Sequence, residues 1–172
     1  TTLQGARFTL HVANGARMLL GAPRLAKISS ALTKASKGRV PLWTNAMPQP
    51  ERAVRLTPPI EDARPRVVYL AACVSRVMGP AAGDKEEMSL LDKTLGLLEK
   101  AGYQVIFPDN MDSLCCGQPF ASKGYNEQAE HKRQELIGAL LHASRGGLEP
   151  IYCDTSPCPL RLVQGLGESR LE

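Results

Sequence analysis

The sequence is poor in aromatic residues and has no long apolar run. One Trp, four Tyr and three Phe are spread over 172 residues, of which 43% are hydrophobic. No apolar run approaches the ~18 residues that a membrane-spanning helix needs. The first residues also lack the positive charge and the following apolar run of a signal peptide. We therefore expect a soluble globular protein of ordinary composition.

Several motifs of catalysis and nucleotide binding are missing as well. No Gly-x-Gly-x-x-Gly or Gly-x₄-Gly-Lys loop is available to cradle a phosphate. No constellation of Ser, His and Asp stands out. No Cys-x-x-Cys pair stands at the start of a predicted helix, as a dithiol redox enzyme would need. These absences argue against nucleotide binding, serine-type hydrolysis and dithiol exchange.

Acidic residues are absent from the first 39 positions, which carry seven Lys and Arg residues. Residues 1–66 hold 11 basic and 3 acidic residues, whereas residues 67–172 hold 10 and 14. A basic block can bind nucleic acid or an anionic membrane. The aromatic side chains of a nucleic-acid platform are absent here, so we expect no nucleic-acid partner. Water, an acidic neighbouring domain and peripheral membrane contact remain open for this face.

The chain contains five cysteines. An odd number argues against a framework of disulfides, and a chain of this length can build a core without them. We expect reduced thiols that act as thiolates in metal or redox chemistry. This implies a cytoplasmic location, with the inner face of the membrane as an alternative. The chain also has no initiator Met and ends in Leu171-Glu172. We expect a piece of a longer protein that is not active alone, with residues 171–172 left from cloning.

The N-terminal part predicts two helices followed by an irregular segment. Residues 6–21 and 23–37 have apolar residues at helical spacing, which predicts a helical hairpin. Residues 39–65 contain six prolines and no periodicity, which predicts a linker. Trp43 is expected to anchor this linker to a core.

Strands and helices alternate from residue 66 onward. The expected strands are short apolar runs at residues 66–72, 104–108 and 150–152. The expected helices cover residues 85–101, residues 122–143 and a last segment that starts near Pro157. This alternation predicts an α/β fold, in which helices flank a parallel β-sheet built from Rossmann-like βαβ units.

Each cysteine follows one of the expected strands. The carboxyl ends of parallel strands share one edge of a sheet, where ligands bind. We therefore expect one cluster of thiols at this edge, made of Cys73, Cys115, Cys116, Cys153 and Cys158. A soft metal or an iron–sulfur cluster would offset the repulsion between thiolates.

The adjacent pair Cys115 and Cys116 suits two different metal atoms better than one, because neighbouring side chains diverge. A single zinc ion takes four ligands, commonly with two to four residues between paired cysteines. Gly117 would allow a close backbone approach and a positive φ. Arg76 would offset thiolate charge or face solvent, and Asp154 would cap a turn.

Three cysteine motifs resemble those of the cysteine-rich CCG domain. They lie at residues 69–79, 113–120 and 154–158, and residues 41–48 resemble the segment before that domain. CCG domains occur in the cysteine-rich subunit of heterodisulfide reductase, in the iron–sulfur subunit of glycolate oxidase and in bacterial D-lactate dehydrogenases that contain FAD and iron–sulfur clusters. The first CCG domain of the last group is the most similar, and the resemblance covers about residues 40–170.

The resemblance implies an electron-transfer module of an FAD-linked 2-hydroxy-acid dehydrogenase. Electrons would leave the flavin, cross ferredoxin-type clusters and reach a non-cubane [4Fe–4S] cluster held by the five cysteines, with Gly117 close to it. Residues 1–38 would be the helical tail of a ferredoxin-like domain, and residues 66–170 the CCG domain. The flavin domain with its FAD, the rest of the ferredoxin-like domain and a second CCG domain would lie elsewhere in the full-length protein. The electron acceptor is not indicated.

Two alternatives remain open at this stage. The last cysteine pair of the family is often Cys-x₂-Cys, whereas four residues separate Cys153 and Cys158 here. Cys153 could therefore end a buried strand rather than bind metal, since free cysteine is often buried. The cluster could also be absent or replaced by zinc, in a structural or docking module without a redox role.

Overall fold

The structure is a computed structural model that describes residues 2–51 and 63–168. Within the expected linker, residues 52–62 lie outside the described residues. The same holds for residues 169–172, which include the expected cloning remnant. No helix among the described residues is long and apolar enough to cross a membrane.

The chain forms two compact units. The first unit comprises residues 1–52 and 77–89, and the second comprises residues 53–76 and 90–172. We describe each unit by itself.

The first unit contains the two predicted N-terminal helices, α1 (Thr2–Leu20) and α2 (Ala22–Ala35). Trp43 follows them and is buried. Its backbone N–H donates to Ser29 Oγ of α2 over 3.2 Å, and Ser29 Oγ donates to the Trp43 carbonyl over 3.4 Å. The prediction that Trp43 anchors its segment is therefore confirmed, and α2 is the element that holds it.

A short antiparallel ribbon completes the first unit. It pairs β1 (Pro48–Pro50), inside the segment expected to be a linker, with β3 (Met78–Ala81). Proline cannot donate to a ladder, so the ribbon shows an irregular register. Short proline-containing strands carry no alternation of apolar and polar residues, which explains why the sequence pattern did not reveal them.

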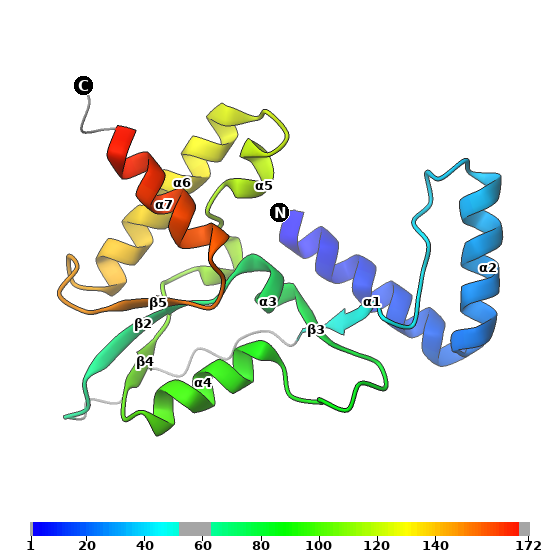
Figure 1. The fold of residues 1–172 in the computed structure, drawn as a ribbon, viewed down its shortest axis with the longest axis horizontal. Coiled ribbons are helices and arrows are strands. Elements are labelled where there is room, and N and C mark those ends of the chain that lie inside the picture. Colours follow the sequence, from blue (N-terminus) through cyan, green and yellow to red (C-terminus); the bar gives the residue numbers. More distant parts are fainter. Residues whose placement is uncertain (1, 52–62, 169–172) are drawn as a thin grey trace. The chain divides into compact units, whose positions relative to one another are not determined.

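The second unit is built on the predicted parallel sheet, in the order β4-β2-β5 (Figure 1). The strands are β2 (Arg66–Leu70), β4 (Gln104–Ile106) and β5 (Ile151–Cys153). Both neighbours pair with β2 in parallel. The expected α/β fold is confirmed, and β2 is its central strand.

Helices cover both faces of this sheet (Figure 1). Helix α4 (Leu90–Lys100) lies on one face, and α6 (Asn126–Ala143) and α7 (Pro157–Glu168) lie on the other. The short helix α3 (Cys73–Val77) follows the end of β2, and α5 (Gln118–Ala121) packs against α6 and α7. The helix expected from residue 85 begins only at Leu90, directly after Ser89, a residue type favoured just before a helix. The helix expected over residues 122–143 begins only at Asn126, because a turn with φ of +82° at Gly124 separates α6 from the short helix α5 before it. The predicted start of α7 at Pro157 is confirmed.

The side chains of β2 and of the two alanines that follow it alternate between two apolar clusters, one on each face of the sheet. Val68, Leu70 and Ala72 face the side of α6 and α7, where Leu136 and Leu140 complete the cluster. The opposite cluster packs under α4 and contains Val67, Tyr69, Ala71, Leu91, Leu98 and Met111. Burial on both faces explains the continuous apolar run of β2.

Truncation of Leu136 to alanine should be strongly destabilising, because this side chain of α6 is only 1% exposed. We expect Leu136→Ala to lower the free energy of unfolding by about 2–5 kcal/mol. Leu141→Ala on the same helix is the control, since Leu141 is 51% exposed and its loss should cost less than about 0.5 kcal/mol. Denaturant unfolding of both variants measures the difference, and equal losses would contradict the packing described here.

Candidate metal centre

The five cysteines lie at the carboxyl ends of the three parallel strands, as predicted. Cys73 begins α3, and only Ala71 and Ala72 separate it from the end of β2 at Leu70. Cys115 and Cys116 lie between the short 3₁₀ turn Met111–Ser113, which follows β4, and α5. Cys153 is the last residue of β5, and Cys158 lies in the first turn of α7.

All five thiols form one continuous row, in which each thiol is close enough to the next to shift its pKa. The contacts run from Cys73 to Cys115, then to Cys116, to Cys158 and finally to Cys153. Cys116 and Cys158, in the middle, are buried, whereas Cys73, Cys115 and Cys153 are half-buried. We call this set the thiol row. The sequence predicted that the thiols cluster, but not the order in which they contact one another.

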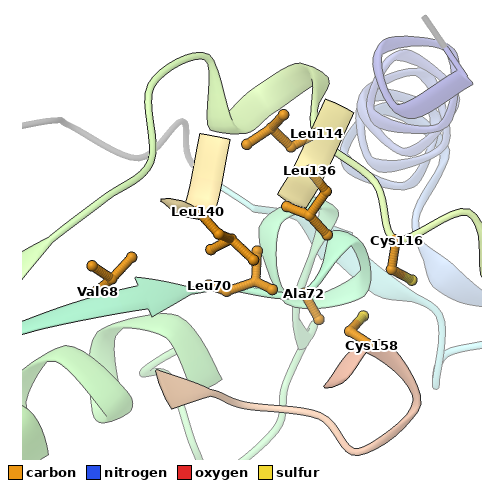
Figure 2. Close-up of a cluster of buried hydrophobic side chains, with 8 residues drawn as sticks. All are labelled: Val68, Leu70, Ala72, Leu114, Cys116, Leu136, Leu140 and Cys158. Atoms are coloured by element: carbon orange, nitrogen blue, oxygen red, sulfur yellow. The ribbon is translucent and has the colours of Figure 1, made fainter. Parts of the chain in front are cut away.

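The thiol row borders the apolar cluster on the α6 side of the sheet. Figure 2 shows Cys116 and Cys158 at the end of this cluster, close to Ala72 and away from Val68. Four of the five cysteines also line a small cavity of about 10 Å³, which has room for about one water molecule. Its lining residues are Leu70, Ala71, Ala72, Cys73, Arg76, Leu114, Cys115, Cys116, Leu136 and Cys158.

One thiolate at Cys115 accounts for the protonation pattern of the row. The pKa of Cys115 is lowered because Cys116 and Cys73 both donate hydrogen bonds to its sulfur, with further support from the Gly117 N–H and the charge of Arg76. The pKa values of Cys73 and Cys116 are raised, chiefly because they donate to Cys115. Protons thus stay on the neighbours while the charge stays on Cys115.

The pKa values of the two thiols at the other end of the row, Cys158 and Cys153, are raised as well. The pKa of Cys158 is raised chiefly by its hydrogen bond to Cys116, and that of Cys153 by its hydrogen bond to Cys158. Thr155 supports both residues, since Cys153 Sγ donates to the Thr155 carbonyl over 3.4 Å and Thr155 Oγ1 donates to Cys158 Sγ over 3.7 Å. Cys158 and Cys153 therefore keep their protons, as Cys73 and Cys116 do.

Arg76 is buried against the thiol row, at 2% exposure. Its Nε donates to the Ala71 carbonyl over 3.0 Å, and its Nη2 donates to the Leu114 carbonyl over 2.6 Å and to Cys73 Sγ over 3.6 Å. Its Nη1 donates to the Met111 carbonyl. Of the two roles considered for Arg76, the structure favours the one beside the thiols over exposure to solvent.

Asp154, directly after β5, bonds to residues of the central strand and the segment after it, rather than capping a turn as predicted. Its Oδ1 accepts the Ala72 N–H over 2.9 Å, and its Oδ2 accepts the Tyr69 hydroxyl over 2.9 Å. Burial is the main cause of the raised pKa of Tyr69, so this hydroxyl stays protonated and donates. No local signal could reveal these contacts, because 82 and 85 residues separate the partners.

Gly117 lets the cysteine loop approach helix α6. Its φ is +84°, and a Cβ at this position would lie 2.2 Å from the Ala129 carbonyl oxygen. Its N–H also donates to Cys115 Sγ over 3.4 Å. The predicted positive φ and close backbone approach are confirmed. The expected closeness to a cofactor remains a prediction.

The ligand type fits an iron–sulfur group, but the arrangement is not that of a single-metal site. Among the described residues, no group of three or more His, Cys, Asp or Glu side chains is placed so that it could hold a metal ion. The thiols stand in a row rather than around one centre. A group with several metal atoms would need the cysteine side chains to turn, which rotation about χ1 permits.

Comparison with known proteins gives one informative match. The chain is 32% identical over 73 residues to a protein of Exiguobacterium sp. strain AT1b named Lactate utilization protein A. The match spans 42% of this chain and only 26% of that relative. No protein-family model matches the chain, and no solved structure matches it. A CCG domain therefore stays a resemblance based on the cysteine motifs.

Substitution of Gly117 should reveal the cost of the close backbone approach. Gly117→Ala adds a Cβ against the Ala129 carbonyl as well as backbone strain. Gly124→Ala is the control, because Gly124 has φ of +82° and no atom within 4 Å of the added Cβ. We expect a loss in unfolding free energy of about 1 kcal/mol for the control and about 1–3 kcal/mol more for Gly117→Ala. Equal losses in denaturant unfolding would show that Ala129 does not confine this loop.

The thiolate at Cys115 predicts unusual reactivity of the metal-free, reduced protein. Because its pKa is lowered, Cys115 stays ionised as the pH falls, whereas an ordinary thiol loses about tenfold in thiolate per pH unit below about 8.5. We expect Cys115 to react with iodoacetamide even at about pH 5, while the equally half-buried Cys73 stays slow. Mass spectrometry of each cysteine measures this, with the protein in urea as reference. A tenfold loss per pH unit at Cys115 would contradict the assignment.

Proposed function

We propose that this chain is an iron–sulfur electron-transfer part of an oxidoreductase of lactate metabolism, and that the thiol row holds the cluster. The observation that carries the proposal is the contact of all five thiols at the carboxyl edge of a parallel sheet. Cysteine thiolates are the usual ligands of iron–sulfur clusters. Five thiols exceed the four ligands of one zinc ion.

The proposed ligands differ in their surroundings. Cys73, Cys115, Cys116 and Cys158 line the cavity, whereas Cys153 lies outside this lining and contacts Cys158. When bound, an iron–sulfur cluster accepts and releases single electrons, at a potential set by charge, hydrogen bonds to sulfur and burial. The chain supplies each of these through Arg76, the Gly117 N–H and the apolar cluster beside Cys116.

The similarity to Lactate utilization protein A supports the metabolic part of the proposal. We propose that the full-length protein is an FAD-linked 2-hydroxy-acid dehydrogenase in the cytoplasm. Its flavin domain would oxidise the hydroxy acid, and the electrons would pass through a ferredoxin-like domain to the CCG domains. Deletion of the gene should then impair growth on lactate but not on glucose.

Anaerobic reconstitution with iron and sulfide tests the cluster directly. We expect a brown protein whose visible absorption bleaches on reduction, with iron and sulfide bound in comparable amounts. Cys116→Ser should abolish the colour, because Cys116 lies in the middle of the row. Cys153→Ser decides whether the outermost thiol is a ligand or only the end of a strand, since a strand residue would leave the iron content unchanged.

Colourless protein that binds zinc stoichiometrically after the same treatment would overturn the electron-transfer proposal. It would instead support a structural zinc or thiol docking module.

A further inference from the structure

Two charged side chains meet at one peptide group, directly before Cys73. The carbonyl of Ala71 accepts from Arg76 Nε over 3.0 Å, and the N–H of Ala72 donates to Asp154 Oδ1 over 2.9 Å. These two backbone groups belong to the same peptide bond. Its positive end thus faces a carboxylate and its negative end faces a guanidinium, which is a favourable arrangement at both ends.

This peptide lies where the sheet stops. The pairing of β2 with β4 ends at Val68 and Ile106, and the pairing with β5 ends at Leu70 and Cys153. Beyond these points the neighbouring strands no longer provide hydrogen-bond partners. Buried backbone groups nonetheless need partners. Arg76 and Asp154 supply them and so continue the hydrogen bonding of the sheet with side chains.

Each of the two side chains also holds one of the flanking segments. Arg76 bonds to the carbonyls of Met111 and Leu114, in the loop that leads to Cys115 and Cys116. Asp154 is itself part of the segment between Cys153 and Cys158 and bonds to Tyr69 on β2. The thiol row can form only if both segments are held against the end of β2.

We propose that Arg76 and Asp154 are positioning residues of the thiol row, each for one half of it. Arg76 holds the half that contains Cys115 and Cys116, and Asp154 holds the half that contains Cys153 and Cys158. The purpose of the row rests on the proposed function, whereas the positioning itself is a property of the metal-free protein and is tested there.

Hydrogen exchange of backbone amides, mapped by mass spectrometry on the reduced, metal-free protein, measures the two halves separately. We expect Arg76→Met to speed exchange in residues 111–116 by about tenfold or more, the effect of losing a charged hydrogen bond. Exchange in residues 154–158 should stay close to that of the unsubstituted protein. Asp154→Ala should give the reverse pattern.

If Arg76→Met or Asp154→Ala does not fold, conservative variants at the same positions provide the test. Asp154→Asn retains an acceptor for the Ala72 N–H and should restore slow exchange in residues 154–158. Arg76→Lys retains the charge but loses the planar fork, so it should restore slow exchange in residues 111–116 only in part. Arg133→Met is the matched control, because Arg133 is a buried arginine that pairs with Glu130 on α6 and should leave both segments unchanged.

Uniform acceleration of both segments, or no change in either, would overturn the positioning roles. Iron content after anaerobic reconstitution provides the second readout, and we expect it to fall in Arg76→Met and Asp154→Ala but not in Arg133→Met. If the unsubstituted protein takes up no iron while the two halves still respond separately, the proposed function fails and the positioning stands. If it takes up iron and the halves do not respond separately, the positioning fails alone.

Discussion

The peptide group between Ala71 and Ala72 is the point on which the cysteine cluster depends. The central strand ends here, and the segments that follow β4 and β5 must stay beside it without the help of a continuing ladder. A guanidinium on one side and a carboxylate on the other replace the missing strand partners. Hydrogen bonds that involve a charged group contribute about 1.5–3 kcal/mol each. Such contacts are strong enough to define where three separate segments meet.

The distribution of charge within the thiol row follows from this arrangement. Several adjacent thiolates would repel one another, and the row avoids this by concentrating one negative charge at Cys115, beside the guanidinium of Arg76. The remaining thiols keep their protons, and Cys73 and Cys116 donate to Cys115. Gly117 contributes its N–H and, by having no side chain, allows α6 to pack closely behind the loop. Helix, loop and strand end therefore depend on one another around a single charged sulfur.

The sheet and the edge at which the cysteines gather could be predicted because they depend on local patterns. The apolar run of residues 66–72 and the helical periodicities after it predict a parallel α/β fold. The position of each cysteine after a strand predicts that the thiols meet at the carboxyl edge of the sheet. The order of the thiols, the role of Asp154 and the pairing of β1 with β3 depend on contacts between distant residues, which have no local signature. The predicted starts of two helices were too early, since α4 begins only after Ser89 and α6 only after the turn at Gly124. Arg76 is an intermediate case, since its charge beside Cys73 suggested its role but not its three carbonyl partners.

The gradient of burial along the thiol row has a consequence for chemical damage. Cys116 and Cys158 are enclosed, whereas Cys73, Cys115 and Cys153 are partly open to solvent. Oxidants attack thiolates that are accessible, and the first product, a sulfenic acid, condenses readily with a neighbouring thiol. Cys115 combines thiolate character with partial exposure and lies between two thiols. Oxidation of Cys115 would thus begin as a reversible disulfide rather than as irreversible overoxidation, so a protein that has met oxygen could still be repaired by a reductant.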